Sequence, residues 1–379
     1  MKIALLVPGG VDRSGRVRVI PVLLALIERL ARSHQVVVIT FHQEPEPCEY
    51  SLLGARVINL GQVAARTSLG RISAWVNRVH SALNAAGGNV DVLHGFWVHP
   101  VGTVSVAVGA WLRVPVVISV GGGEMVWLPE IGYGGQGTWR SRSAISMTLR
   151  RASAVTAGSE YALRPVAAIR PDALRLPLGV DLHTFHGPVE RSAGPPWRLL
   201  HVAGLNPVKD QTTLLRAMRL VLEKHPHTHL DCVGVDTLGS RMQNLAHDLG
   251  IHAAVRFHGF RPLDEIVPMY RAAHLYVQSS LHESMGAAVL EAAASGLPTV
   301  GTNLGVLAEM ALQAGVAIPV KDPADLAGGI VHLLDHPDRR QSLARAAQAF
   351  SETYDADWTA AQLQAVYDRV IRKPGWRGR

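Results

Sequence analysis

The chain has 379 residues, which is too long for one ordinary hydrophobic core and suits two domains of roughly 150 to 200 residues each. Hydrophobic residues make up 48% of the chain and charged residues 18%, without a low-complexity tract, so a disordered, collagen-like or coiled-coil protein is excluded. The two cysteines, Cys48 and Cys232, have no CxxC neighbour and no His at ligand spacing, so we expect neither a disulfide framework nor a structural zinc site. A reducing cytoplasm fits this cysteine usage.

The net charge of +7 is distributed unevenly along the chain. Residues 1–180 contain 18 Lys and Arg against 10 Asp and Glu, whereas the remaining residues contain 19 and 20. Either the basic half is a solvated surface, or it serves an anionic substrate or a peripheral contact with an anionic membrane. Nucleic acid is not an expected partner, because the basic residues are not interleaved with aromatic ones.

No stretch of the chain is expected to cross a bilayer or to act as a signal peptide. The apolar N-terminal run stops at Pro8, which predicts a buried first strand. Longer apolar stretches, such as residues 101–112, are interrupted well before the roughly 18 residues that a membrane span needs.

In chain order, short β-branched runs alternate with helical patterns, which is typical of parallel sheets covered by helices on both faces. In the first half, strands are predicted at residues 2–7, 35–40, 56–60, 91–94, 115–120 and 154–157, with helical spacing of apolar residues over 19–30 and 72–83. After the Pro- and Gly-rich stretch 187–196 the pattern begins again, with strands at 198–203, 229–234, 254–258, 274–278, 298–301 and 316–320.

This order of elements predicts an α/β fold with two Rossmann-like, doubly wound domains that face each other across a cleft, where the carboxyl ends of the strands bind ligands. We place the N-terminal domain at residues 1–178 and the C-terminal domain at residues 179–355. A final helix over about residues 356–372 is expected to pack back on the first domain. Residues 373–379 are expected to form a frayed basic tail.

The most informative segment runs from Leu281 to Thr302. It follows a strand and contains a predicted helix over residues 285–294, with Glu283 at the helix entry and Glu291 near the middle. An ionised Glu291 among apolar neighbours is costly unless partners satisfy it, and hydroxyl groups of a ligand would do so. The amides of the first helical turn, next to Gly286, form an anion site suited to a diphosphate. The alternative is one glutamate on a solvated face and the other stabilising the helix dipole.

Glu283 and Glu291, with seven residues between them and followed by Ala-Ser-Gly-Leu-Pro-Thr-Val-Gly-Thr, resemble the donor-site signature of the family 4 retaining glycosyltransferases of the GT-B fold. Residues 176–181 with Phe185 resemble the family's hinge motif, residues 202–210 its phosphate loop, and residues 255–259 its base-binding strand end. The resemblance covers most of the chain. It implies that the second domain binds a nucleotide-diphosphate sugar and the first domain binds the acceptor.

The resemblance also implies roles for individual residues. Glu291 would bond the ribose, Glu283 the transferred sugar, and Lys209 the diphosphate, as an ammonium placed between a turn and a helix start. Further residues implied at the donor site are Gly286, Ser284, Met285, Gly259, and the glycine-rich loop Gly9, Gly10 and Gly15. Residues implied on the acceptor side are Glu124, Gly122 and Gly123. His94 and His99, near a strand end, are expected to be structural.

Two positions depart from the family pattern. Gly204 stands five residues before Lys209, where the family usually has an Arg, and Gly121 stands where it commonly has a His near the reacting sugar. The diphosphate clamp is then either weaker than usual or completed by another cation.

The resemblance implies a front-face substitution with retained configuration, in which the leaving phosphate takes the acceptor proton and the protein supplies positioning and charge stabilisation. We expect no required cofactor or divalent metal, and a glycan, a lipid-linked molecule or a small molecule as acceptor. A non-catalytic sugar-nucleotide-binding partner subunit and a GT-B sugar-nucleotide epimerase remain alternatives. A nicotinamide-dependent oxidoreductase is disfavoured, because no strand is followed by Gly-x-Gly-x-x-Gly with an acidic residue about 20 positions later.

Overall fold

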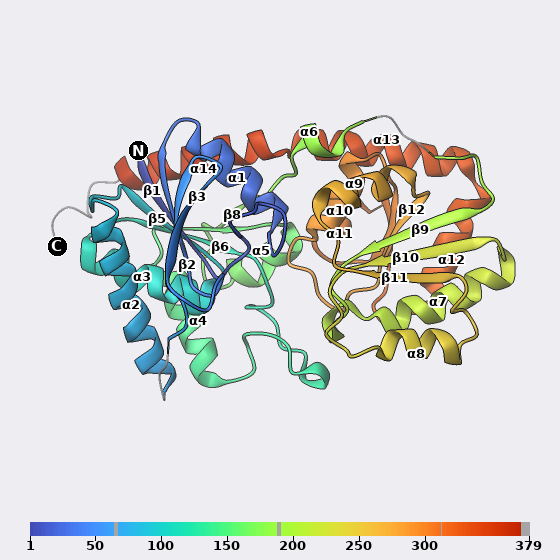
Figure 1. The fold of residues 1–379 in the computed structure, drawn as a ribbon, viewed down its shortest axis with the longest axis horizontal. Helices are drawn as coiled ribbons and strands as arrows, with labels where there is room; N and C mark the ends of the chain where they lie inside the picture. Colours follow the sequence, from blue (N-terminus) through green and yellow to red (C-terminus); the bar gives the residue numbers. More distant parts are fainter. Residues whose placement is uncertain (64–66, 188–190, 312, 373–379) are drawn as a thin grey trace. The chain divides into compact units, whose positions relative to one another are not determined.

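The computed structural model describes residues 1–63, 67–187, 191–311 and 313–372. It divides into two compact units, which are coloured along the chain in Figure 1. Unit 1 comprises Met1–Leu178 together with the segment that begins at Ala356, and unit 2 comprises Gly179–Asp355. The basic tail predicted at residues 373–379 lies outside the described residues, as do residues 188–190 of the stretch between the two periodic halves.

Unit 1 is built on an eight-stranded sheet in the order β3-β4-β2-β1-β5-β6-β7-β8. Its strands are β1 (Lys2–Val7), β2 (Gln35–Thr40), β3 (Cys48–Leu52), β4 (Ala55–Asn59), β5 (Val92–Phe96), β6 (Val116–Val120), β7 (Ala154–Ala157) and β8 (Leu174–Arg175). All pairs are parallel except β3 with β4. The order reverses between β1 and β5, so the loops that follow these two strands flank the switch point of the sheet.

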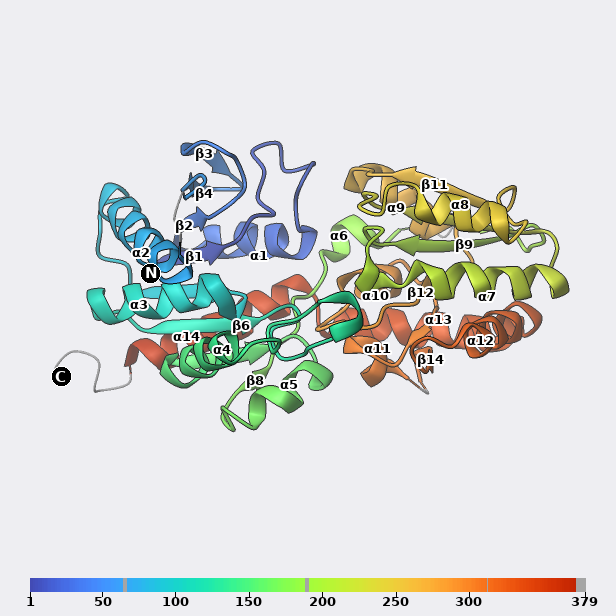
Figure 2. The same cartoon turned by 90° about the horizontal axis from the view of Figure 1, so that it is seen from below.

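Helices cover both faces of this sheet (Figures 1 and 2). On one face, α1 (Pro21–Ala31) and α14 (Ala356–Arg372) share a core with the inward residues of β1 and β2. On the other face lie α2 (Ser68–Ala85), α3 (Thr103–Leu112), α4 (Trp139–Arg151) and α5 (Glu160–Ala167). The C-terminal helix therefore packs on the first sheet, because its apolar stripe, which includes Leu363, Val366, Tyr367 and Val370, is buried there.

Unit 2 contains a six-stranded parallel sheet in the order β11-β10-β9-β12-β13-β14. Its strands are β9 (Trp197–Val202), β10 (Thr228–Val233), β11 (Val255–Gly259), β12 (Leu275–Gln278), β13 (Thr299–Thr302) and β14 (Gly315–Ile318). Numbered within the unit, this order is 3-2-1-4-5-6, the dinucleotide-binding Rossmann order. The switch point falls between β9 and β12.

The helices of unit 2 are α6 (Leu182–Phe185), α7 (Gln211–Lys224), α8 (Arg241–Asp248), α9 (Leu263–Ala272), α10 (Ala287–Ala294), α11 (Gly305–Met310), α12 (Pro323–Asp335) and α13 (Pro337–Thr353). The helices α7, α8 and α12 share one core with the sheet. The helices α9 and α10 lie on its other face (Figure 1).

The helix expected over residues 285–294 begins two residues later than predicted. Gly286 is its N-cap and has a φ of +90°, which a right-handed helix cannot include. Glu283 therefore precedes α10 by four residues instead of lying at its entry, whereas Glu291 lies within α10 as predicted.

Among the described residues, no helix has the length and apolarity needed to span a bilayer.

Candidate functional site

In unit 2, the loops that follow β9 and β12 meet at the switch point of the sheet. Lys209 ends a short 3-10 turn, Pro207–Lys209, after β9, and Glu283 lies in the loop after β12. Two hydrogen bonds join these loops: Leu281 N–H donates to the Val208 carbonyl at 2.7 Å, and the Ser279 hydroxyl donates to the Lys209 carbonyl at 2.9 Å. The two loops are therefore fastened where an open α/β sheet binds its ligand.

The Lys209 ammonium and the Glu283 carboxylate form an ion pair at this point, with an Nζ–Oε1 distance of 2.5 Å. The same Oε1 accepts a hydrogen bond from the Ser280 hydroxyl at 2.7 Å. Their side chains are 25% and 12% exposed, so the pair is partly shielded yet reachable by a ligand. An anion that enters here meets a cation already held in place.

A buried histidine supports the loop that carries Lys209. His201, on β9, is bonded through Nδ1 to the Val277 carbonyl on β12 and through Nε2 to the Gln211 amide at the start of α7. Burial lowers the pKa of His201 to about 4, so the ring is neutral, donates from Nδ1 and accepts at Nε2. Gln211 in turn donates to the Gly204 carbonyl. Sequence reasoning did not find this network, because a lone His in a strand carries no positional signal.

Glu291 is buried on α10, as its apolar neighbours suggested. The hydroxyl of Tyr270, a fully buried residue of α9, donates to Glu291 Oε2 at 2.8 Å. Burial raises the pKa of Glu291 to about 7, and the bond from Tyr270 opposes this rise only in part. The carboxylate is therefore poised to gain from hydroxyl donors supplied by a ligand. Tyr270 was also missed from the sequence, where it is one more apolar residue of an amphipathic helix.

The first turn of α10 has no side-chain cap, because its N-cap is Gly286. The leading N–H groups of a helix have no acceptor within the helix, and they carry the positive end of the helix dipole. Ser284 is buried and Met285 is half-buried just before this turn, and the Met285 carbonyl accepts from Val306 N–H. The segment 284–286 thus presents an uncapped helix end next to Glu283.

The carboxyl ends of β9, β10 and β11 form a second part of the candidate ligand-binding edge of this sheet. At Gly204, a Cβ atom would meet only ordinary contacts, with Asn206 Nδ2 at 3.4 Å and the Val235 carbonyl at 3.6 Å. Gly259 ends β11 with a φ of +66° and has open space around it. Val235 and Phe260, in the loops after β10 and β11, are 53% and 44% exposed. Two exposed apolar side chains therefore lie at the same carboxyl edge of the sheet as the charged pair.

The glycine-rich loop of unit 1 follows β1 and is held by side chains. Gln43 Oε1 accepts the amides of Gly10 and Val11 at 2.8 and 3.0 Å, and Gly15 N–H donates to the Asp12 carbonyl. Gly10 has a φ of +86°, and a Cβ there would lie 2.6 Å from the Ile20 side chain. Gly15 lies in the same loop and precedes α1 by six residues. The amides of Gly10 and Gly15 are thus occupied within the loop.

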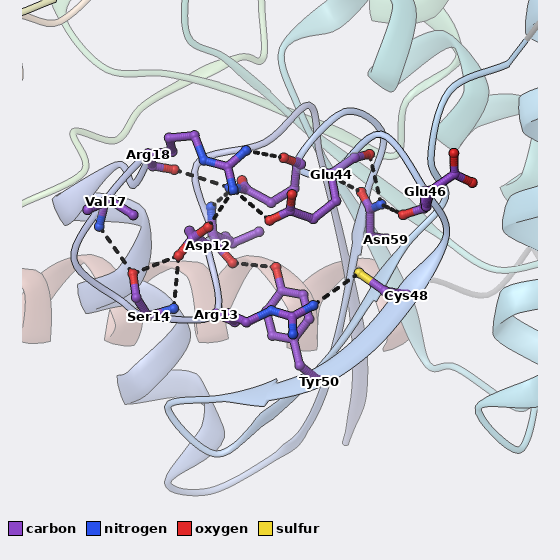
Figure 3. Close-up of polar contacts among 12 residues, drawn as sticks. Asp12, Arg13, Ser14, Val17, Arg18, Glu44, Glu46, Cys48, Tyr50 and Asn59 are labelled. Atoms are coloured by element: carbon purple, nitrogen blue, oxygen red, sulfur yellow. Dashed lines mark hydrogen bonds and ion pairs between the residues drawn. The ribbon is translucent and has the colours of Figure 1, made fainter.

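An ionic cluster closes the same loop (Figure 3). Arg18 Nη2 lies 2.7 Å from Asp12 Oδ2 and 2.6 Å from Glu44 Oε1. Burial acts to raise the pKa of Asp12, but bonds from Ser14 and from Arg18 hold that pKa below its ordinary value. Asp12 is ionised at neutral pH, and it fixes the loop through Arg18.

Glu124 is buried, and its carboxylate ties together the loops after β5 and β6. Oε1 accepts from Val98 N–H at 3.0 Å, and Oε2 accepts from Gly122 N–H at 2.6 Å. Burial raises the pKa of Glu124 even though these backbone bonds act to lower it. Both carboxylate oxygens accept main-chain bonds, so within the described residues Glu124 orders the backbone at this edge of unit 1.

The indole of Trp97 fills the space beside the glycines of this loop. A Cβ at Gly121 would lie 3.3 Å from the Trp97 ring, and one at Gly122 would lie 2.9 Å from Trp97 Nε1. A Cβ at Gly123 would lie 2.5 Å from the ring of Tyr133. Trp97 has a φ of +67°, a strained conformation for a non-glycine residue that is found preferentially at functional sites. At Gly121, where the family commonly has a His, the neighbouring aromatic ring is that of Trp97, from the loop after β5.

His94 is fully buried and makes structural contacts. Its ring nitrogens are bonded to the Tyr367 hydroxyl on α14 at 2.7 Å and to the Ser119 hydroxyl on β6 at 2.8 Å. Burial lowers the pKa of His94 to about 3, so the ring stays neutral at physiological pH. His99 is bonded to the Thr103 hydroxyl, and burial lowers its pKa as well.

One Asp-x-Asp triplet, a spacing at which two carboxylates can bind a metal ion, is present in the chain at Asp355-Ala356-Asp357. Asp357 opens α14 and pairs with Arg29 of α1 at 3.0 Å. In the part of the chain that the structure describes, no three His, Cys, Asp or Glu side chains gather as metal ligands.

Comparison with known sequences gives two family matches and a set of relatives. Residues 19–179 match the glycosyl transferase 4-like domain, and residues 186–350 match the glycosyl transferases group 1 domain. The D-inositol 3-phosphate glycosyltransferase of Corynebacterium kroppenstedtii is 32% identical over 52% of this chain and 44% of its own length. That of Thermomonospora curvata is 36% identical over 50% of this chain and 49% of its own. The chain thus spans about half the length of the curated relatives it matches.

Solved structures share the fold over nearly the whole chain. The Anabaena protein HepE, in complex with UDP, has a TM-score of 0.73 at 18% identity, over 97% of this chain and 100% of its own. Sucrose-phosphate synthase from Thermosynechococcus elongatus has a TM-score of 0.78 at 18% identity, over 98% and 99%. Both units are therefore the Rossmann-like domains of a GT-B fold. Together with the two domain matches, this fold shows that the chain belongs to the group 1 glycosyltransferases of the family 4 type.

Proposed function

We propose that the protein transfers a sugar from a nucleotide-diphosphate sugar to an acceptor hydroxyl, with retention of the anomeric configuration. The observation that carries this proposal is the pairing of Lys209 with Glu283 at the switch point of unit 2, beside the uncapped start of α10. The UDP complex of HepE, a protein of the same fold, supports a nucleotide donor.

In this proposal the leaving diphosphate is stabilised by Lys209 and by the amides next to Gly286. Charge on the diphosphate grows as the anomeric bond breaks, so a fixed cation and a helix start lower the barrier more than they favour the bound ground state. In the structure, the Glu283 carboxylate pairs with the Lys209 ammonium. A bound sugar would engage the Glu283 carboxylate through its hydroxyls, and the diphosphate would take over the ammonium.

The ribose is assigned to Glu291 on α10, and the base to the edge formed by β9, β10 and β11. Glu291 would accept hydrogen bonds from the two ribose hydroxyls, which compensate the cost of its burial. The exposed apolar groups Val235 and Phe260, with Gly259, would contact the base. This assignment is consistent with a carboxyl group whose pKa burial raises to about 7.

The acceptor is assigned to unit 1, at the loops after β5 and β6, where Glu124 accepts from the backbone amides of Gly121 and Gly122 and where Gly123 follows. Gly9, Gly10 and Gly15, in the loop after β1, are assigned to the donor phosphate. Two curated relatives are D-inositol 3-phosphate glycosyltransferases, which makes a polyol phosphate one acceptor class to test. The leaving phosphate would take the proton of the acceptor hydroxyl, so no side chain needs to act as a nucleophile.

Calorimetric titration with UDP, GDP, ADP and TDP, and with the sugar derivative of the tightest binder, tests the donor site. We expect one base to bind, and Lys209→Ala and Glu291→Gln to weaken that binding. A protein that binds none of the four nucleotides contradicts the proposal.

Product analysis separates the remaining alternatives. Nucleoside diphosphate released only with an acceptor present indicates transfer, and the anomeric proton coupling of the product reports its configuration. Isomerised donor in the absence of acceptor indicates an epimerase. Binding without turnover across an acceptor panel favours a non-catalytic partner subunit, the alternative raised by Gly204 and Gly121.

A further inference from the structure

Three neighbouring helices on one face of unit 1 carry no acidic residue. The helices α2, α3 and α4 lie side by side over the sheet (Figure 2), and their sequences contain six arginines and neither Asp nor Glu. The helices α1 and α14 on the opposite face mix both signs, and Arg29 and Arg32 there pair with Asp357 and Glu28. The positive excess of the N-terminal half is thus concentrated on one face.

Four of these arginines lie exposed on α4. Arg140, Arg142, Arg150 and Arg151 are exposed. Arg142 Nη1 donates to the Gln136 carbonyl at 3.1 Å and Arg140 lies over the Trp139 ring, but no carboxylate among the described residues forms an ion pair with any of the four. Arg71 at the start of α2 is exposed as well, whereas Arg78 is occupied by the carbonyls of Leu60 and Gln62. The charge on α4 is therefore available to a partner.

Large apolar side chains are exposed among these cations. Trp139 is 65% exposed, Trp111 is 54% exposed, and Met147 is 44% exposed. The Trp111 ring stacks on His80 of α2 with centroids 4.0 Å apart, which fixes an indole at the surface. Single exposed apolar residues are ordinary, but exposed tryptophans on the same three helices as arginines without carboxylate partners match the composition of surfaces that lie at a lipid interface.

A depression of about 540 Å³ lies on α4 within this surface. It is lined by Arg142, Ser143, Ser146, Met147, Arg150 and Arg151. Three guanidinium groups and two hydroxyls around one hollow match the charge and hydrogen-bonding needs of a phosphate headgroup. Met147 lines the same depression, where its side chain would contact the first methylene groups of the lipid next to the headgroup.

We propose that the exposed face of α2, α3 and α4 docks the protein on an anionic phospholipid membrane. Charge complementarity selects this occupant. The three helices carry six arginines and no carboxylate, which favours anionic headgroups. Trp111, Trp139 and Met147 would enter the interfacial layer while the arginines remain at headgroup level. The proposal stands independently of the donor site, since none of these residues belongs to it.

Co-sedimentation of the full chain with phosphatidylglycerol and phosphatidylcholine vesicles tests the proposal. We expect binding to the first and not to the second, with loss at high salt as surface charge is screened. Each arginine contributes about fivefold in affinity, which corresponds to about 1 kcal/mol, so replacing Arg140, Arg142, Arg150 and Arg151 by Gln weakens binding at least about a hundredfold. Trp139→Ala weakens it further, also in vesicles of the highest anionic content.

A charge-matched control removes four exposed arginines of unit 2, Arg216, Arg219, Arg241 and Arg345, also as Gln. We expect this variant to bind vesicles within about twofold of the wild type, because its substitutions lie outside the docking face. Circular dichroism and thermal melting establish that both variants are folded. Equal losses in the two variants, equal binding to neutral vesicles, no vesicle binding at low salt, or binding to single-stranded RNA in preference to vesicles would each overturn the proposal.

Discussion

Replacing Glu291 by Gln should make the ligand-free protein more stable and its nucleotide binding weaker. The substitution keeps the shape of the side chain and an oxygen that accepts from Tyr270, and it removes the charge. A residue kept for packing alone would not show opposite changes in stability and affinity, so the pair of measurements separates a binding role from a structural one.

The stability effect follows from the pKa of Glu291, which burial raises from 4.5 to about 7. The folded state then binds this proton more tightly than the unfolded state does, so the free energy of unfolding falls as pH rises from about 4.5 to about 7. The shift corresponds to a penalty on the order of 3 kcal/mol above pH 7. Gln avoids this penalty but buries a new amide donor, which costs about 1 to 2 kcal/mol, so we expect a net gain of about 1 to 2 kcal/mol.

Thermal melting of both proteins near pH 4.5 and near pH 8 measures this gain. For a domain the size of unit 2, about 1 kcal/mol shifts the midpoint by about 2 to 4 °C, so the variant should melt several degrees higher near pH 8 and no higher near pH 4.5. Glu265→Gln is the matched control, because this exposed residue of α9 pairs only with Arg261 and should leave the pH dependence unchanged. Calorimetry should show about 10- to 150-fold weaker nucleotide binding by Glu291→Gln.

Two results would refute this reasoning. If the variant melts no higher than the wild type near pH 8, burial of the ionised Glu291 carboxylate does not destabilise the folded protein. Unchanged nucleotide affinity means that Glu291 does not accept hydrogen bonds from the ligand.

Lys209→Ala should lower kcat by a larger factor than it raises the donor KM, because charge on the diphosphate grows in the transition state. Steady-state kinetics measure both constants. Equal rates for the variant and the wild type would mean that another cation binds the diphosphate. Gly204→Arg should raise donor affinity about tenfold through a charge-assisted hydrogen bond, since position 204 has space for a side chain and no positive φ. An unchanged affinity in calorimetry would show that another cation already does the work of the missing arginine. Tyr270→Phe removes the hydrogen-bond donor that lowers the pKa of Glu291, so the pH above which nucleotide binds tightly should move upward. Calorimetry over a range of pH measures this shift. An unchanged pH dependence would argue against the effect of Tyr270 on the pKa of Glu291.

Much of the fold was predictable from periodicity. The strands β1, β2 and β7 have the predicted bounds, and the bounds of the other buried strands differ from the predicted ones by one or two residues. These strands could be predicted because runs such as residues 35–40 are apolar on both faces. The strands β3 and β8 were not predicted. The first is an edge strand with alternating exposed residues, Cys48–Leu52, and the second has only two residues, so neither carries a buried apolar run.

The candidate site was predictable where chemistry appears in short motifs. Glu291 is anomalous in an apolar helix, and Lys209 and Glu283 lie in motifs that resemble those of the family, so all three could be named in advance as candidates. The contacts Lys209–Glu283 and Tyr270–Glu291 could not be predicted, because they join segments 74 and 21 residues apart through the order of the sheet. The position of Trp97 was not predicted for a related reason. It depends on a φ of +67° and on contact with Gly121 and Gly122, which lie in the loop after a different strand, β6.

The most direct test of the central claim is the release of nucleoside diphosphate from a panel of UDP-, GDP-, ADP- and TDP-sugars, each with and without candidate acceptors. The donor site built on Lys209, Glu283 and Glu291 predicts that one donor is consumed by the wild-type protein, with a glycosylated acceptor formed in equal amount. It predicts background release by Lys209→Ala and Glu283→Gln, and wild-type rates for the control Glu265→Gln. Release that persists unchanged in the Lys209 and Glu283 variants would contradict the assignment of the reaction to this site.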